Sequence, residues 1–366
     1  MNRTTVLLLF GGESSEHDVS IASARNVYAA IDDEKYDVLL GYIGKQGKWW
    51  LLDEWTDTPE RHGGTQLLVA PGTGSLMTMP GSRVLHPHVI LPILHGKNGE
   101  DGSIQGLAQL THIPIVGCGI LASALCMDKM RTKLLLENQV RVGIKTAAWI
   151  LFSNAAQLQQ ELAIWTHTNE MGYSDLTERI GDGPWFVKPS RAGSSVGVSK
   201  VEKIEDMQAA IKRAFEHDDT VLVEEAIEGR ELEVAVLGTP PYHEASGVGE
   251  IIPGDTFYTY DDKYASDSAS QVKLDTDLPT ALQDAIRERA LKAYEVLGCE
   301  GLARIDFFLT PKLEIYLNEV NTLPGFTSVS MYPKLWRHQG LSYSQLVERL
   351  LSLAMDDTIQ SELKEE

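Results

Sequence analysis

Short apolar runs alternate with helical stretches over the first third of the chain, and this alternation constrains the fold more than any other feature. The runs "TVLLLFGG" (5–12), "YDVLLGYIG" (36–44) and "VILPILHG" (89–96) each predict a short strand. After the first run, apolar residues recur at helical spacing at Ala24, Val27, Tyr28 and Ile31. Short buried strands separated by helices predict an α/β fold with a parallel sheet.

Two loops of this region are expected at the same edge of that sheet. "GGESSEH" follows the first apolar run, and "HGKNGEDG" follows the third. Ligands of parallel α/β sheets bind at the carboxyl ends of the strands, which is where both loops begin. We therefore expect the two loops to line a binding site.

The chain has 366 residues, more than most single-core domains hold, so we expect two or three domains. The order of strand and helix signals favours three. The predicted bounds are 1–123 for an N-terminal domain, 124–224 for a central domain and 225–366 for a C-terminal domain, with a hinge at 220–228. The polar, turn-rich segment 166–183 is interpreted as a surface insertion.

A formal net charge of -20 argues against nucleic acid and anionic membranes as partners, because an acidic surface repels both. Three scattered cysteines, Cys118, Cys126 and Cys299, show no metal-binding spacing and fit reduced cytosolic thiols. The first apolar run is too short for a signal-peptide core or a membrane span. We expect a cytoplasmic protein in which local cations hold any anionic ligand.

Two late strands carry polar residues at alternating positions. In "ARIDFF", Arg304 and Asp306 share one face of the strand, and in "LNEVN", Glu319 and Asn321 do the same. If the strands pair, one face carries all four side chains. Two carboxylates and an amide are suitable ligands for Mg²⁺, with phosphate oxygens completing its coordination. The alternative is an ion-paired polar face without metal.

The segment that follows, "TLPGFTSVSMYP", is a candidate ligand loop. Gly325 can bring its backbone N–H close to a ligand, and Ser330 offers a hydroxyl group. A plain Pro-Gly turn is the alternative.

A lysine ends the apolar strand "PWFVK", and a loop of small residues follows it. Lys188 is a candidate phosphate partner, and the Gly/Ser loop 193–197 offers backbone N–H groups as an anion cradle. Lys129, on a helix predicted over 123–138, is a second candidate cation. The alternatives are a hairpin turn and solvated surface charges. The chain contains no P-loop motif.

Two further segments are candidates for nucleotide contact. Glu224 and Glu231 lie in or beside the predicted hinge, where they could hold the hydroxyl or amine groups of a nucleotide, although surface charge is the alternative. The aromatic-rich loop 254–271 contains Lys263 and Tyr264 and predicts a lid over the site. A loop whose aromatic residues simply pack down is the alternative.

Eight segments, in order over nearly the whole chain, resemble the D-alanine–D-alanine ligases of the ATP-grasp superfamily. They are "FGGESSEHDVS", "LHGKNGEDGSIQG", "MDKMRTK", "FVKPSRAGSSVGVSKV", "VEEAIEGRELEVAVLG", "FYTYDDKY", "ARIDFFL" and "NEVNTLPGFTSVSMYPKLW". The resemblance implies an α/β ATP-grasp fold of three domains. An N-terminal parallel α/β domain precedes two α+β domains, which sandwich ATP between them.

The resemblance also implies roles at the substrates. Glu16 holds the ammonium group of the first alanine, supported by Ser194 and Tyr264. Arg304 and the amide of Gly325 stabilise the oxyanion. The remaining substrate residues are His95 at the first-alanine site and Ser330 and Met331 at the second, with Met331 standing where leucine is frequent in the family.

For the nucleotide and metal, the resemblance implies ATP with two Mg²⁺ ions, or Mn²⁺ in their place. Asp306, Glu319 and Asn321 are the implied metal ligands. The implied nucleotide residues are Lys129, Lys188 and Lys263 at the phosphates, Ser195 in the covering loop, and Glu224, Ile227 and Glu231 at adenine and ribose.

The implied reaction joins two D-alanines through an acyl phosphate, for peptidoglycan precursor synthesis, in an enzyme expected to be a homodimer. A ligase that uses D-lactate or D-serine as second substrate is the nearest alternative, and Tyr264 in "DDKY" favours D-alanine. A different ATP-grasp ligase and an ATP-binding regulatory protein without turnover are the others. The four polar residues of the late strands disfavour the regulatory protein, because nucleotide binding alone needs no oxyanion group.

Overall fold

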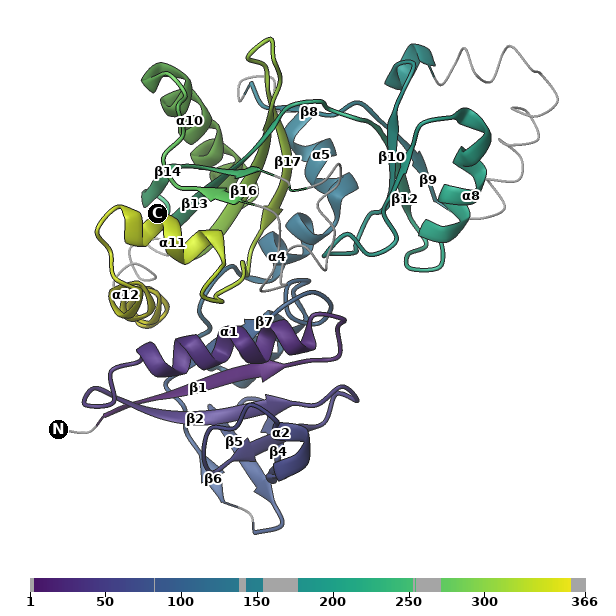
Figure 1. Ribbon diagram of the computed structural model, residues 1–366. Helices are drawn as coiled ribbons and strands as arrows, with labels where there is room; N and C mark the ends of the chain where they lie inside the picture. The colour runs from purple at the N-terminus through teal and green to yellow at the C-terminus, as the bar shows by residue number, and fades with distance from the viewer. Residues whose placement is uncertain are drawn as a thin grey trace.

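The computed structural model describes residues 3–81, 83–137, 143–153, 177–252, 254 and 271–356. These residues form three β-sheets (Figure 1). The N-terminal third of the chain forms the first sheet, at the bottom of Figure 1. The second sheet lies at the upper right of that view, and the third lies at the upper left.

The first sheet has the strand order β6-β5-β4-β3-β2-β1-β7. Its strand β1 (Thr4–Gly11) pairs in parallel with β2 (Tyr36–Ile43) and with β7 (Val89–Leu94). Helix α1 (His17–Ala30) connects β1 to β2 and buries Ala24 and Val27. The three predicted strands and the helix after the first are confirmed.

The prediction of a parallel sheet is right for these three strands only. Four more strands continue the sheet in antiparallel pairs: β3 (Trp49–Leu52), β4 (Thr65–Ala70), β5 (Ser75–Met79) and β6 (Val84–Leu85). A tight turn, in which the N–H of Gly47 donates to Gly44 at 2.8 Å, joins β2 to β3. So short a connection can join only antiparallel neighbours. Two helices complete the region, α2 (Pro59–His62) and α3 (Ser103–Thr111).

The second sheet is antiparallel throughout and has the order β11-β10-β12-β9. Its strands are β9 (Trp149–Phe152), β10 (Trp185–Pro189), β11 (Ser199–Val201) and β12 (Val221–Glu225). Helix α8 (Ile204–Ala214) packs Met207 and Ile211 against Trp185 and Val187 of β10. The sheet therefore has its own small core on the α8 side.

The third sheet has the order β15-β14-β13-β16-β17-β8. Its strands are β8 (Lys145–Thr146), β13 (Arg230–Thr239), β14 (Tyr242–Ile252), β15 (Gln271–Lys273), β16 (Leu302–Leu309) and β17 (Ile315–Asn321). Helix α10 (Thr280–Val296) buries Ile286, Ala290 and Tyr294 in the core of this sheet.

The single helix predicted over 123–138 is two helices, α4 (Ile120–Met127) and α5 (Lys129–Glu137). Asp128 separates them, because its backbone is extended and its carboxylate accepts a hydrogen bond from the N–H of Arg131 at 3.2 Å. An aspartate in this position caps the start of a new helix. Both helices contribute to the core of the third sheet, whereas the predicted boundary at 124 assigns most of them to the central domain. The three domain bounds remain predictions.

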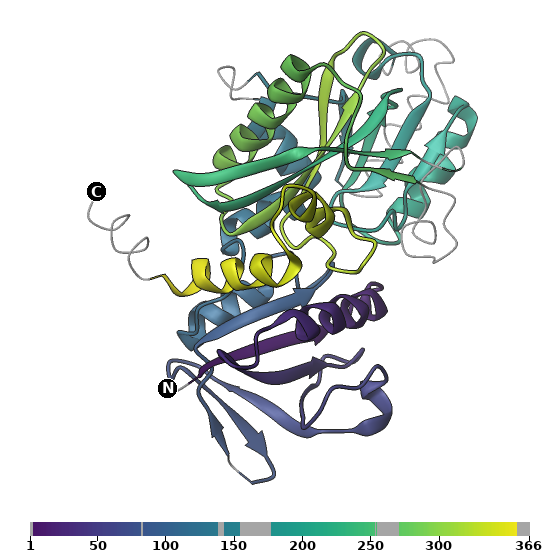
Figure 2. The same cartoon turned by 60° about the vertical axis from the view of Figure 1, so that its left-hand side comes forward.

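The first and third sheets are joined through the C-terminal helices α11 (Met331–His338) and α12 (Tyr343–Met355). Leu346 and Leu350 of α12 share a core with Val6 and Leu8 of β1 and with Leu237 of β13. Figure 2 shows α12 between the two regions. Among the residues described, no helix combines the length and apolar character that crossing a membrane requires.

Candidate active site

A cavity opens where loops of all three regions meet. The loops after β1 and β7, the small-residue loop after β10 and the segment after β17 contribute its walls, which border about 1040 Å³ of space that is open to solvent. Ten predicted site residues line it: Glu16, His95, Lys129, Ser194, Arg304, Glu319, Asn321, Gly325, Ser330 and Met331. The two loops predicted to lie at one edge of the first sheet do meet there.

The predicted polar face of the late strands is present. β16 and β17 pair in antiparallel register, with Arg304 opposite Asn321 and Asp306 opposite Glu319. The guanidinium group of Arg304 donates to both carboxylate oxygens of Asp306, at 2.8 and 2.7 Å, and Asn321 Nδ2 donates to Asp306 Oδ2 at 3.1 Å. The expectation that the strands pair is therefore confirmed.

Sequence reasoning missed one member of this face, Glu233 on β13. It lies opposite Asp306 in the register of β13 and β16, and its Oε2 is 3.1 Å from Arg304 Nε. Burial opposes the charge of Arg304, but Asp306 and Glu233 outweigh burial and raise its pKa well above the ordinary value. The available signal was that Glu233 and the predicted Glu231 are two residues apart on one strand and so share a face.

The donor set of this face fits a divalent cation. Asp306, Glu319 and Glu233 offer carboxylate oxygens, and Asn321 offers an amide oxygen, all of them the hard ligands that Mg²⁺ prefers. Within the described residues, two side-chain cations face these three carboxylates, Arg304 and Lys129, with Lys129 Nζ 3.6 Å from Glu319 Oε2. One negative charge among these groups is therefore left for a cation to balance.

The first loop places Glu16 against the small-residue loop. Ser194 Oγ donates a hydrogen bond to Glu16 Oε1, although the two residues come from different regions of the fold. Ser194 has a φ of 51°, a left-handed conformation that side chains rarely adopt. Gly96 has a φ of 71°, and a Cβ there would lie 2.8 Å from Glu16 Oε2. Close packing thus fixes the position of the Glu16 carboxylate.

Outside the cavity lining, two lysines contact one buried carboxylate. Lys188 Nζ lies 2.6 Å from Glu224 Oε2, and Lys133 Nζ lies 3.2 Å from Glu224 Oε1. Burial opposes the charge of Glu224, but the two ammonium groups outweigh burial and hold its pKa below the ordinary value. Lys133 is a second residue that sequence reasoning missed.

Both ends of the chain match models of one enzyme family. Residues 5–118 match the D-ala D-ala ligase N-terminus, and residues 139–352 match the D-ala D-ala ligase C-terminus. The chain is 44% identical to a D-alanine--D-alanine ligase A of Chromobacterium violaceum over 370 residues, covering 97% of this chain and 96% of that protein. This chain belongs to the D-alanine–D-alanine ligase family.

Solved structures agree with this family assignment. The D-alanine-D-alanine ligase of Coxiella burnetii matches with a TM-score of 0.84 and 32% identity, covering 100% of this chain and 98% of that one. The VanG D-Ala:D-Ser ligase of Enterococcus faecalis matches with a TM-score of 0.82 and 35% identity, covering 96% and 100%. The fold is the α/β ATP-grasp of this family, as the sequence resemblance implied.

The remaining predicted nucleotide residues of this ligase-family chain lie outside the cavity lining. Ser195 follows Ser194 in the small-residue loop and has a φ of 59°. Ile227 lies in the turn between β12 and β13, and Glu231 pairs with Phe308 in the sheet. The predicted lid residues Lys263 and Tyr264, and most of the predicted insertion 166–183, lie outside the described residues.

His95 is buried between the first and third regions. Its Nδ1 lies 3.1 Å from the carbonyl of Leu323, which can only accept, so Nδ1 carries the proton. Its Nε2 lies 3.2 Å from Ser23 Oγ and can accept from that hydroxyl group. Burial lowers the pKa of His95, despite the nearby carboxylate of Glu16. The imidazole is therefore neutral in the cavity wall.

Glu100 is a third residue missed from the sequence, although it lies in the quoted segment "HGKNGEDG". Its Oε2 accepts a hydrogen bond from the N–H of Gly96 at 3.1 Å. Burial, reinforced by the Glu16 carboxylate, raises its pKa well above the ordinary value. Glu100 therefore adds a carboxyl group that can hold a proton beside Glu16.

The segment after β17 forms the far wall of the cavity. Ser330 Oγ accepts a hydrogen bond from the N–H of Thr327 at 3.0 Å, which folds the segment back on itself. A Cβ on Gly325 would lie 2.7 Å from Ser330 Oγ. Met331 begins α11 and is buried. Glycine at position 325 thus leaves its backbone open to the cavity.

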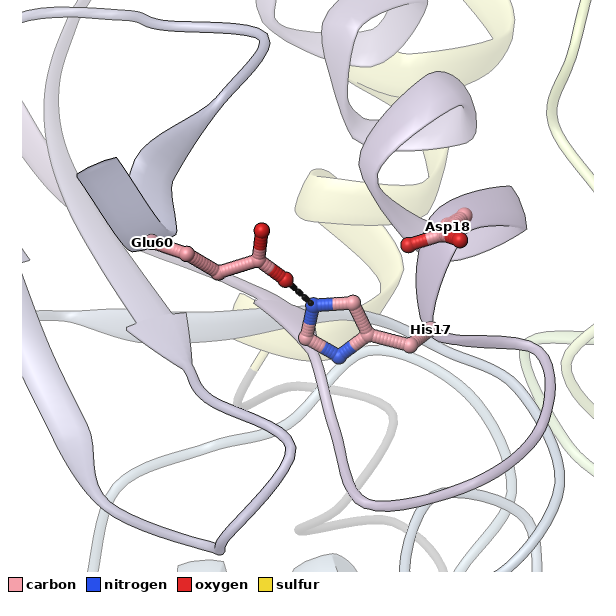
Figure 3. Close-up of side chains that lie close together, drawn as sticks. All are labelled: His17, Asp18 and Glu60. Atoms are coloured by element: carbon pink, nitrogen blue, oxygen red, sulfur yellow. Dashed lines mark ion pairs between the residues drawn. The ribbon is translucent and has the colours of Figure 1, made fainter. Parts of the chain in front are cut away.

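A separate cluster, His17, Asp18 and Glu60, lies beside the first loop (Figure 3). Buried His17 places Nδ1 2.6 Å from the Gly12 carbonyl and Nε2 3.3 Å from Glu60. Lys45 already supplies a cation, at 3.3 Å from Asp18 and 3.9 Å from Glu60. We therefore interpret His17 as an anchor of the loop that carries Glu16.

Proposed function

We propose that this protein joins two D-alanines to D-alanyl-D-alanine, using ATP and forming ADP and phosphate, for peptidoglycan precursor synthesis. The observation that carries the proposal is the pairing of β16 with β17, which brings Arg304, Glu319 and Asn321 to the wall of one cavity with the Glu16–Ser194 pair. Asp306 lies beside them, bonded to Arg304 and Asn321. Nucleotide binding alone has no need for that combination.

In the first step, the carboxylate of the first D-alanine attacks the γ-phosphorus of ATP and becomes an acyl phosphate. Glu16 holds the substrate ammonium group, Ser194 orients Glu16, and His95 closes the adjoining wall. Lys129 and Lys188 offset the charge of the phosphates. Phosphoryl transfer depends on such positioning and charge stabilisation rather than on a protein nucleophile.

The family uses ATP with a divalent metal, and we propose two Mg²⁺ ions, or Mn²⁺, held by Asp306, Glu319 and Asn321. Bound there, the ions neutralise phosphate charge and polarise the reacting phosphoryl group. The Asp306 carboxylate is held in position by the hydrogen bonds that it accepts from Arg304 and Asn321.

In the second step, the amine of the second D-alanine attacks the acyl carbon, and phosphate leaves from the tetrahedral intermediate. Arg304 and the N–H of Gly325 stabilise the negative oxygen that forms there. Ser330 and Met331 hold the second D-alanine. Lys263 and Tyr264 belong to a lid that excludes water, which otherwise hydrolyses the acyl phosphate.

The nucleotide side of the proposal uses both sheets of the ATP-grasp. Glu224 and Ile227 contact adenine, Glu231 contacts ribose, and Ser195 belongs to the loop that covers the phosphates. We also propose the domain bounds 1–123, 124–224 and 225–366, a homodimer, and a cytoplasmic location without nucleic acid or membrane partners.

The test is phosphate release from Mg-ATP with D-alanine, with L-alanine, and with D-alanine plus D-lactate or D-serine, followed by mass analysis of the products. We expect release with D-alanine and not with L-alanine, with the dipeptide as product. The variant Asp306→Asn is expected to need at least about tenfold more Mg²⁺ for half-maximal rate. A mixed product as the main species would move the assignment to a D-serine or D-lactate ligase. ATP binding without amino-acid-dependent release would leave a regulator.

A further inference from the structure

We infer that Lys133 is the permanent counter-charge of Glu224, a positioning residue that keeps this buried carboxylate ionised and oriented when Lys188 turns to the phosphates of ATP. The inference rests on the proposed function, in which Glu224 holds adenine and Lys188 contacts phosphate. It adds a residue from α5 to the nucleotide site.

The two lysines that contact Glu224 are held very differently. Lys133 is 3% exposed, and its Nζ also donates to the carbonyl of Ala147 at 3.0 Å. Its helix α5 is fixed in the core of the third sheet through Leu136. Lys133 therefore has two acceptors, Glu224 and the carbonyl of Ala147, and lies on a helix that is held in place by packing.

Lys188 is placed so that it can leave. It lies one residue before the end of β10, ahead of the small-residue loop that reaches the cavity, and it forms an ion pair with Glu224 at 2.6 Å. Its side chain is 10% exposed, compared with 3% for Lys133. Of the two ammonium groups, Lys188 is thus the one that a bound phosphate can attract.

The charges support the same division of roles. Two ammonium groups around one carboxylate leave one positive charge in excess, which attracts a polyanion. When Lys188 pairs with phosphate, Lys133 and Glu224 remain as a neutral pair. Without Lys133, the same movement would leave a buried carboxylate with no cation beside it, and an unpaired buried charge is strongly unfavourable.

The two oxygens of Glu224 are held by different lysines. Lys188 Nζ lies 2.6 Å from Oε2, and Lys133 Nζ lies 3.2 Å from the buried Oε1. When Lys188 turns to the phosphates, Oε2 is freed, and an amine of the nucleotide base can donate to it while Lys133 stays with Oε1. Lys133 thereby fixes which oxygen faces the base.

The groups that face Glu224 make its protonation on nucleotide binding a measurable test of the inference. They are Lys133 of α5 and Lys188 of β10, and Glu137 of α5 acts on it through Lys133. Burial raises the pKa of Glu224, and the two lysines lower it. In Lys133→Met, Lys188 is the remaining partner of Glu224, and nucleotide binding draws it away to the phosphates. Glu224 must then take up a proton as the complex forms.

The experiment is calorimetric titration of the full chain with Mg-ADP at pH 7.5, in two buffers that differ in ionisation enthalpy, which gives affinity and proton uptake together. We expect Lys133→Met to bind at least about tenfold more weakly, because each pKa unit opposed by the environment costs a factor of ten. The variant should also take up as much as one proton more than the natural chain for each nucleotide bound. Lys133→Arg should restore both values.

Two control variants separate this role from general damage. Lys188→Met loses affinity without additional proton uptake, because Lys133 still pairs with Glu224. Lys145→Met removes the exposed ion pair of Lys145 with Glu314, at 2.7 Å, and leaves both values unchanged. Equal proton uptake in Lys133→Met and the natural chain overturns the inference. Failure of the natural chain to bind Mg-ADP overturns the proposed function, and this inference with it.

A second comparison does not depend on the folding of Lys133→Met. In Glu224→Gln the carboxylate charge is gone, and in Lys133→Met/Glu224→Gln no buried charge of this pair remains. If Lys133 acts through Glu224, these two variants bind Mg-ADP with equal affinity and equal proton uptake. Weaker binding by the double variant, by more than about threefold, would show that Lys133 acts on the nucleotide directly and would overturn the inference.

Discussion

The proposed metal face of the third sheet, formed by Asp306, Glu319 and Glu233, and the lysine pair around Glu224, formed by Lys133 of α5 and Lys188 of β10, are opposite solutions to the burial of charge. On the metal face, Arg304 and Lys129 meet three carboxylates, so negative charge is in excess. At Glu224, two lysines meet one carboxylate, so positive charge is in excess. A cation bound to a polyanion, such as Mg-ATP, balances both. The comparison shows how a chain with a net charge of -20 can hold a polyanion through local charge alone.

Removing a cation from the metal face should have the largest effect. Arg304→Met leaves Asp306 and Glu233 without their shared partner and removes the proposed oxyanion donor. We expect kcat to fall by about 10²–10³, with a much smaller change in the KM for ATP. Steady-state phosphate release measures both constants. A larger change in the KM for ATP than in kcat would contradict the view that the metal face acts mainly on the chemical steps.

The two regions also differ in how far the sequence predicts them. Arg304, Asp306, Glu319 and Asn321 were predicted together because strand alternation is a local rule and their strands are neighbours in sequence. Glu233 was missed because its place depends on the pairing of β13 with β16, about 70 residues apart.

The lysine pair shows more clearly how far the site can be predicted from the sequence. Lys188 stands out because an apolar strand leads into it, but no local pattern encodes the contact of Lys133 on α5 with Glu224 of β12. Its helix was itself predicted as part of a longer one, since the break at Asp128 depends on a cap. The antiparallel part of the first sheet was missed because its strands, β3 to β6, were not predicted, and the strands that were predicted here are separated by helical stretches, which indicates parallel pairing.

Removing the movable cation from the lysine pair should affect binding instead of chemistry. Lys188→Met abolishes the excess positive charge and the expected phosphate contact. We expect the KM for ATP to rise by about 10–100-fold, the value of one charge-assisted hydrogen bond, with kcat changed less. Titration with Mg-ADP provides the independent measurement. An unchanged Kd would mean that Lys188 stays with Glu224 in the complex.

A third variant displaces the Glu16 carboxylate without removing it, and leaves both charged regions unchanged. In Gly96→Ala, the added Cβ would lie 2.8 Å from Glu16 Oε2, and the φ of 71° disfavours a side chain. We expect the KM for D-alanine to rise by about tenfold, as a carboxylate misplaced by a fraction of an ångström loses its substrate contact. The KM for ATP serves as the internal control, because neither charged region changes. A parallel rise in both constants would indicate general damage to the cavity.

The smallest effect concerns His95, a neutral group between the charged regions. Its pKa in the folded chain is below the ordinary 6.5, so the unfolded chain binds more protons once the pH falls below that value. The stability that neutral His95 contributes is thus complete above pH 6.5 and is lost as the pH falls through the folded pKa.

The measurement is the melting temperature of the natural chain and of His95→Gln between pH 8 and pH 5. We expect the difference between the two proteins to shift against the natural chain as the pH falls, by at most about 1.4 kcal/mol per pH unit. Glu100 titrates with the opposite sign but is present in both proteins, so its contribution cancels. A difference independent of pH would mean that His95 has the same pKa in the folded and the unfolded chain, so that water reaches its imidazole in the cavity wall.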